Sequence, residues 1–315
     1  PYCLQVTEEV QIYEKLLRNS SLSEAPCAPD TLRMLAQFSV LTRLKEHENS
    51  SVYSKLRIYD GENLKDIDPK AKSIQEYRDS AGVDEGMDGL STRFAFKILS
   101  KVFNFDAEET AANPVHLMYV LEKQIEQEQF PEDIRDRYVN FLKEYLTPRY
   151  VDFLGKEIQT AYLESYSQYG QNIFDRYINY ADLWIQDQDF RNPETGEILD
   201  HTALNDELEK IEKAAGIGNP KDFRHEVVNF VLRARASIDG KNPAWTSSET
   251  LRVVIELTMC SGAEELLPVI SFNPRASDED QQKHEDFVER LVEYGYTHKQ
   301  VRLLSEWYMR VRKSQ

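Results

Sequence analysis

Apolar residues recur at intervals of three and four along most of the chain, which is the spacing of helices with one buried face. Val10, Tyr13 and Leu17 share one face of a segment that begins at Thr7. A second segment, 30–44, carries a leucine or phenylalanine at every third position from 32 to 44. Both segments are predicted to be amphipathic helices.

The regular pattern stops between residues 45 and 88. This stretch is rich in charges and contains Gly61, Pro69, Gly82 and Gly86. Two short ordered pieces are expected inside it, at 52–58 and 71–78. Insertions of this length are functional or mobile more often than short turns are.

Helical spacing resumes at Gly89. Ser91 is a suitable N-cap, and Phe94, Ile98 and Val102 follow it on one face. Residues 190–200 are predicted to form a surface turn, and 266–272 a short apolar piece. Further helices are predicted at 114–129, 131–146, 150–185, 201–213, 221–236, 247–259, 278–293 and 298–313.

These patterns predict an all-α protein in two domains. Residues 1–130 form a small four-helix bundle with the insertion at 45–88, and residues 131–315 form a larger helical domain. Pro1 has no initiator methionine before it, so the chain is expected to be part of a longer protein.

The balance of acidic and basic residues narrows the classes of binding partner that we expect for this chain. The chain has 55 acidic and 38 basic residues and a net charge of −17. Such a charge repels phosphate backbones and anionic lipid heads, so neither nucleic acid nor a membrane is expected as a partner. The three cysteines, Cys3, Cys27 and Cys260, are far apart in sequence, which suits a reducing cytoplasm. No apolar run is long enough to span a bilayer.

The segment with the most specific indication of a functional site is Gly89-Leu90-Ser91-Thr92-Arg93. A positive side chain in the first turn of a helix faces the positive end of the helix dipole, so a negative group is expected beside Arg93. One interpretation is an ion pair with Asp84, Glu85 or Asp88. The other is a sensor arginine that reaches the terminal phosphate of ATP.

The order of helices favours the second interpretation. Segments 8–18, 30–44, 89–104 and 114–129 follow one another in an order that resembles the helical lid of AAA+ ATPases. In that lid, a turn ending in the sensor-2 arginine opens the third helix.

Longer strings carry a more specific resemblance, which covers the chain from Pro1 to Ser314. The chain resembles the PrkA family of bacterial serine protein kinases in YDGENLKDIDPKAKS (59–73), DEGMDGLSTRFAFKILSKVFNF (84–105), AANPVHLMYVLE (111–122), GKEIQTAYLESYSQYGQNIFDRY (155–177), NPKDFRHEVVNFVLRARA (219–236), ELLPVISFN (265–273) and KQVRLLSEWYMRVRKS (299–314).

The resemblance implies an AAA+ lid followed by a PrkA C-terminal domain, in a cytoplasmic, ATP-dependent transferase of the stress response. It implies that an N-terminal AAA+ core holds ATP and Mg²⁺, and that this chain alone binds neither. Arg93 is the one nucleotide-contacting position that it transfers. The expected partners are that core, a protein substrate and further copies of the protein.

Motifs for phosphoryl transfer do not occur in this sequence. No segment matches G-x-x-x-x-G-K-[ST] or the Gly-rich, H-R-D and D-F-G set of protein kinases. Arg135-Asp136 with Asn140 has the wrong spacing and lacks the histidine. Asp152-Phe153-Leu154-Gly155 lies inside a helical pattern. The catalytic residues are therefore unknown.

Other candidate groups are better explained as structural. The six histidines lack the spacing of zinc ligands, and no metal is expected. Carboxylate pairs such as Glu207/Glu209 suit solvated helix faces. The aromatic residues from Tyr150 to Trp184 suit a core more than a cofactor pocket. The basic C-terminal end, which includes Arg302 and Arg310, follows a turn in the manner of a DNA-binding helix, but the acidic balance opposes this interpretation.

Two alternatives to a kinase part stay open at this point. The chain could be a binding module that recruits partners and performs no chemistry, or it could belong to an ATP-dependent protease or remodelling machine.

Overall fold

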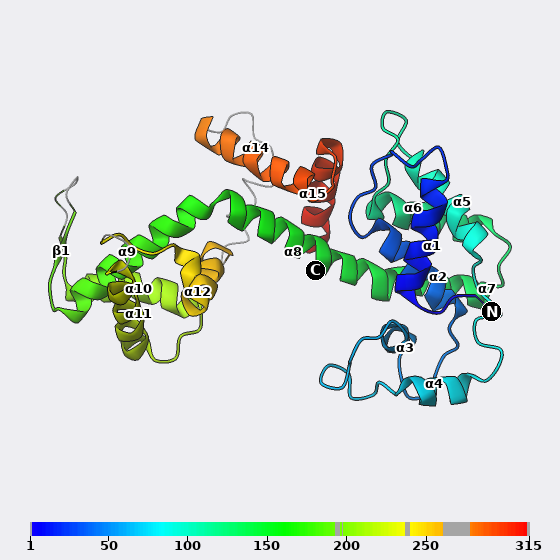
Figure 1. Cartoon of the computed structure of the whole chain (residues 1–315), viewed down its shortest axis with the longest axis horizontal. Coiled ribbons are helices and arrows are strands. Elements are labelled where there is room, and N and C mark those ends of the chain that lie inside the picture. The colour runs from blue at the N-terminus through cyan, green and yellow to red at the C-terminus, as the bar shows by residue number, and fades with distance from the viewer. Residues whose placement is uncertain (1, 193–195, 197, 237–239, 261–277, 314–315) are drawn as a thin grey trace. The chain divides into compact units, whose positions relative to one another are not determined.

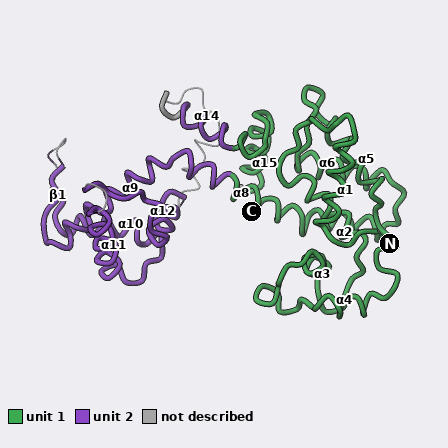
Figure 2. The backbone as a smooth tube through the Cα atoms, viewed as in Figure 1, with its two compact units in different colours: residues 1–157, 291–315 green, residues 158–290 purple. Residues whose placement is uncertain are grey.

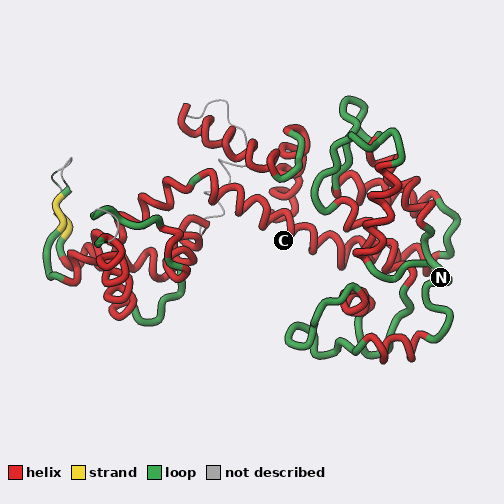
Figure 3. The backbone as a smooth tube through the Cα atoms, viewed as in Figure 1, coloured by secondary structure: helices red, strands yellow, loops and turns green. Residues whose placement is uncertain are grey.

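Helices dominate the structure (Figures 1 and 3). The computed structural model describes residues 2–192, 196, 198–236, 240–260 and 278–313. Within these residues the one sheet is a two-stranded antiparallel ribbon, in which β1 (Phe190–Arg191) pairs with β2 (Ile198–Leu199). The predicted all-α class is confirmed.

The chain divides into two compact units, coloured separately in Figure 2. The first contains residues 1–157 and 291–315, and the second contains residues 158–290. Compact units and evolutionary domains need not share limits, so the domains predicted at 1–130 and 131–315 stay a prediction.

Four helices in the first unit follow the order predicted for a lid. They are α1 (Val6–Arg18), α2 (Thr31–Arg43), α5 (Thr92–Phe103) and α6 (Pro114–Gln127). Helix α2 packs against the other three, and nearly all its side chains are buried. Its polar positions also lie in the core, where the Tyr13 hydroxyl donates to Ser39 Oγ at 2.9 Å.

The insertion at 45–88 folds into two short helices, α3 (Val52–Tyr59) and α4 (Ile74–Ala81). Ser73 begins α4 with a capping box, in which its side chain and that of Glu76 each accept from the other's backbone N–H. Helix α3 packs against α2 and α4. The insertion is therefore attached to the bundle through α3.

A long helical stretch follows the bundle. Helix α7 (Glu132–Asn140) continues through a π-helical turn (Phe141–Leu146) into α8 (Thr147–Ser165). Pro148, in the first turn of α8, cannot donate to the preceding turn, and the π-helical turn lies directly before it. The proline therefore widens the helix and does not end it.

The C-terminal helix returns to the bundle. Helix α14 (Asp278–Glu293) leads to α15 (His298–Lys313), which belongs to the first unit. Lys299 pairs with Asp106 at 2.6 Å, and the Gln300 side chain donates to the Ala112 carbonyl at 2.9 Å. These bonds fix α15 to the connection between α5 and α6, nearly two hundred residues earlier in sequence.

The second unit is built on α9 (Ser167–Ile185). It contains α10 (His201–Ala214), α11 (Pro220–Arg235), a 3₁₀ turn (Trp245–Ser247) and α12 (Glu249–Cys260).

At its centre, the buried guanidinium of Arg224 donates twice to Glu212 at 2.7 Å, and Tyr177 donates to the same carboxylate at 2.9 Å. This network explains how a charged pair is tolerated in the core.

Three predicted segments differ in detail from the structure. The run predicted at 150–185 is interrupted at Tyr166, where α8 ends and α9 begins. The turn predicted at 190–200 contains the β1–β2 ribbon, because Ile198 and Phe190 suit paired strands. The apolar piece predicted at 266–272 lies outside the described residues.

Candidate functional site

The turn that opens α5 is held tightly against α2. Gly89 has φ +96°, and a Cβ atom on it would lie 2.6 Å from the Thr42 carbonyl oxygen. Only glycine fits there without displacing backbone. The next residue, Leu90, donates its N–H to the Thr42 hydroxyl at 3.0 Å. The position of Gly89-Leu90 is therefore set by α2.

A buried arginine anchors the same turn from the other side. Arg43, 2% exposed, donates from Nε to the Leu90 carbonyl at 2.9 Å and from Nη1 to the Cys3 carbonyl at 2.9 Å. Its guanidinium also forms two bonds to the fully buried Glu9 carboxylate, at 2.8 and 2.7 Å. Burial disfavours the charged guanidinium, yet the bonds to Glu9 outweigh burial and raise the pKa of Arg43.

The segment before the turn is fixed by a second buried carboxylate. Glu85 accepts from the Lys55 ammonium, from the Tyr59 hydroxyl at 2.7 Å and from the Lys45 N–H at 3.0 Å. Burial, and then the hydrogen bond to Glu85, raise the pKa of the Tyr59 hydroxyl. Gly86 adds a backbone bond to the Arg43 carbonyl at 3.3 Å. Both sides of residues 84–91 are therefore tied to the bundle and to α3.

Arg93 projects from this fixed base. Ser91 caps α5 as predicted, accepting from Phe94 N–H at 3.2 Å, so Arg93 lies in the first turn. Its side chain is exposed, and in the part of the chain that the structure describes it makes no hydrogen bond or ion pair. An anion brought to the head of α5 would meet both this guanidinium and the positive end of the helix.

The three carboxylates that the sequence suggested as partners of Arg93 form no ion pair with it among the described residues. Glu85 is bound by Lys55 and Tyr59, and Asp84 lies 3.8 Å from the Lys45 ammonium. Asp88 is exposed. Among the described residues, no ion pair of Arg93 with Asp84, Glu85 or Asp88 is present.

Other residues considered from sequence do not form a second centre. No group of three or more His, Cys, Asp or Glu side chains gathers as metal ligands among the described residues. Tyr150, Phe174 and Tyr177 are buried as core residues. Glu207 and Glu209 pair with lysines one turn away on α10. Within the described helices, none is long and apolar enough to cross a membrane.

The anchors of the turn were not foreseen from sequence. Glu9 and Arg43 lie 34 residues apart, and each sits in a pattern that resembles an ordinary charged helix face. The one available signal was position: Arg43 ends the apolar face of its helix, and Glu9 lies between Val6 and Tyr13.

The first unit is a helical bundle with an exposed arginine in the first turn of α5, and no ion pair of this arginine occurs among the described residues. Comparison with protein-family models assigns the chain to a particular family. The family model described as the PrkA serine protein kinase C-terminal domain matches residues 53–307, and the PrkA AAA domain model matches residues 1–51. The chain belongs to the PrkA family.

Curated relatives agree with this assignment. A protein of Escherichia coli (strain K12) named serine/threonine kinase YeaG is 70% identical over 100% of this chain and 49% of its own length. A protein of Bacillus subtilis (strain 168) named ATP-dependent protease PrkA is 30% identical over 94% of this chain and 46% of its own length. The chain thus spans about half the length of these relatives. No solved structure matches it.

The two family models meet close to the candidate site. The AAA model covers α1 and α2, whereas Gly89 to Arg93 lie in the range of the C-terminal model. Glu9, Thr42 and Arg43, which hold the turn, all belong to the AAA range. The turn is therefore a point where the two matched regions contact each other.

Proposed function

We propose that this chain is the nucleotide-responsive helical part of a PrkA-family, ATP-dependent serine protein kinase. An AAA+ core in the other half of the protein binds ATP and Mg²⁺ in the cytoplasm, and the bundle of α1, α2, α5 and α6 acts as its lid. The kinase named among the relatives, at 70% identity, and the match of residues 1–51 to an AAA domain support this proposal.

Arg93 is the residue that senses the nucleotide. Its guanidinium neutralises charge on the terminal phosphate oxygens and thereby couples lid position to the presence of ATP. The observation that carries the proposal is that Arg93 is exposed and unpaired among the described residues, on a turn anchored by Arg43 and Glu9.

The rest of the chain relays lid movement to a protein substrate or to a neighbouring subunit. Within the first unit, the start of α8 is tied to α2 by the ion pair of Arg149 with Asp30, one bond of which is 3.0 Å. Helix α15 is tied to the α5–α6 connection by Lys299 and Gln300. A movement of the bundle therefore carries both helices with it.

A protease machine is the second candidate, because the Bacillus subtilis relative is named an ATP-dependent protease. The two functions are separated by incubating the full-length protein with ATP and candidate substrates. Transfer of labelled phosphate to serine supports the kinase. Degradation of an unfolded reporter that needs ATP supports the protease.

Replacement of Arg93 tests the sensor role. In the full-length protein, Arg93→Ala is expected to lower ATP turnover by roughly tenfold or more, because a charge that stabilises the transferring phosphate is lost. Helical content, measured by circular dichroism, should stay unchanged because Arg93 is exposed.

Arg18→Ala is the matched control, since Arg18 is exposed on α1 and contacts only Glu14, one turn away, among the described residues. Its ATP turnover should equal that of the unmodified protein. Unchanged turnover in Arg93→Ala would contradict the sensor role.

A further inference from the structure

Residues 83–88, here named the acidic knob, expose apolar side chains on a rigid base. Val83 is 94% exposed and Met87 is 56% exposed. Between them, Glu85 is buried and bound to Lys55 and Tyr59. The segment is therefore held at its centre while it presents two apolar side chains to water.

Carboxylates flank these apolar side chains. Asp84 and Asp88 are exposed, and the contact of Asp84 with Lys45 is long, at 3.8 Å. The knob is also tied to the N-terminal segment, because the Tyr2 N–H donates to the Gly86 carbonyl at 2.7 Å. It therefore offers a preformed combination of two apolar and two negative groups.

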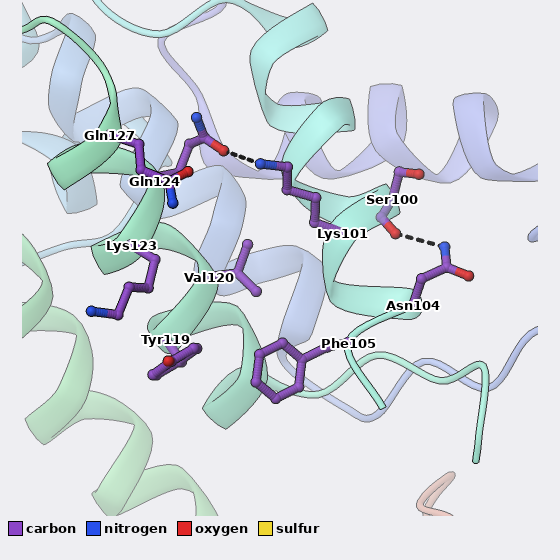
Figure 4. Close-up of a pocket in the computed structure, with 9 residues that line it drawn as sticks. All are labelled: Ser100, Lys101, Asn104, Phe105, Tyr119, Val120, Lys123, Gln124 and Gln127. Atoms are coloured by element: carbon purple, nitrogen blue, oxygen red, sulfur yellow. Dashed lines mark hydrogen bonds between the residues drawn. The ribbon is translucent and has the colours of Figure 1, made fainter. Parts of the chain in front are cut away.

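A complementary surface lies between α5 and α6 of the same unit (Figure 4). This open groove, here named the α5–α6 groove, has a volume of about 540 Å³. Figure 4 shows the rings of Phe105 and Tyr119 beside each other at one end, with centroids 5.3 Å apart. The two residues are about half exposed, at 43% and 50%.

The charge of the groove is opposite to that of the knob. Its lining includes Lys101 and Lys123 and no carboxylate, in a chain whose net charge is −17. Lys101 bonds to the neutral side chain of Gln124, so no carboxylate neutralises it directly there. Lys123 lies over the Tyr119 ring and pairs at 3.2 Å with Glu126, at the exposed edge.

We propose that the α5–α6 groove of one copy receives the acidic knob of a second copy. Met87, an unbranched and adaptable side chain, packs against Phe105 and Tyr119. Asp84 and Asp88 then face Lys101 and Lys123. The combination of buried apolar groups and paired charges supplies both affinity and orientation.

The knob and the groove lie at different places on the first unit. The knob precedes α5, whereas the groove begins at Ser100, in the second half of that helix. A copy that offers its knob to one neighbour and its groove to another is joined head-to-tail, the arrangement that builds rings or open chains, whereas two copies that each fill the other's groove form a two-fold pair through the same contact. The contact extends the proposed function by naming how neighbouring subunits meet. Its test measures association, so that either proposal can fail while the other stands.

Charge reversal in the full-length protein tests the contact. A groove variant, Lys101→Glu with Lys123→Glu, and a knob variant, Asp84→Lys with Asp88→Lys, should each associate at least roughly tenfold more weakly in analytical ultracentrifugation at low salt. An equimolar mixture should regain association, because each reversed surface meets its complement. Circular dichroism and thermal unfolding of each variant verify that it is folded.

A further variant tests the apolar part of the contact. Met87→Ser should weaken association, whereas Ile67→Ser, which changes an exposed apolar residue outside the knob, should not.

An unmodified protein that stays monomeric at micromolar concentration would overturn the proposal. So would charge-reversed variants that associate normally, or an equimolar mixture of them that does not regain association. If knob variants lose ATP turnover while association is unchanged, the knob acts through the turn of Arg93 or on the nucleotide-binding core, which also overturns the proposal.

Discussion

Glu9→Ala is expected to destabilise the first unit by about 3–5 kcal/mol, the usual cost of leaving one partner of a buried ion pair without its counter-charge. Arg43 would retain its bonds to the Leu90 and Cys3 carbonyls, but its charge would remain in the core with no carboxylate beside it. The free energy of unfolding, from urea titration followed by circular dichroism, measures the loss.

Glu14→Ala is the matched control for this prediction. Glu14 lies on the same helix and pairs with Arg18 in an exposed i, i+4 contact, which contributes about 0.5 kcal/mol or less. Equal losses for the two variants would contradict the role given to the buried pair. Replacing both partners, Glu9→Leu with Arg43→Met, should recover part of the stability because no unpaired charge remains.

Gly89→Ala is expected to cost roughly 2–4 kcal/mol, from a left-handed backbone that now carries a Cβ and from overpacking against α2. The added carbon would lie 2.6 Å from the Thr42 carbonyl oxygen and 2.9 Å from Arg43 Cγ. The turn must move to relieve this close contact, and Arg93, which follows the turn, moves with it. ATP turnover of the full-length protein should therefore fall together with stability.

Gly61→Ala separates the effect of backbone strain from the effect of overpacking against α2. Gly61 has a similar φ, +91°, but nothing lies within 4 Å of an added Cβ. Its replacement should cost only the backbone strain, about 1–2 kcal/mol, and should leave ATP turnover unchanged. If Gly89→Ala costs no more than Gly61→Ala, the close approach to Thr42 is not what positions the turn.

Local chemistry made much of the fold predictable. Ser91 was recognisable as the N-cap of α5 because a short polar side chain precedes an apolar helical face. The apolar spacing of α2 likewise predicted a buried helix. Such features depend on residues close in sequence, where periodicity and capping act.

Contacts between distant residues were not predictable in the same way. Glu9 with Arg43, and Glu85 with Lys55, are residue types that normally lie at the surface, so their burial followed only from the packing of separate helices. The same holds for Gln300, whose bond to Ala112 places α15 on the bundle. For the candidate site, the sequence offered Arg93 as a candidate, which stays a prediction, but it did not indicate the residues that hold its turn.

In the proposed function, Arg93 meets the terminal phosphate of ATP. The most direct measurement is a structure of the full-length protein with a non-hydrolysable ATP analogue and Mg²⁺. We expect the Arg93 guanidinium within hydrogen-bonding distance of a terminal phosphate oxygen, with Gly89 still against Thr42. An Arg93 side chain directed away from the nucleotide, with another cation in its place, would contradict the account.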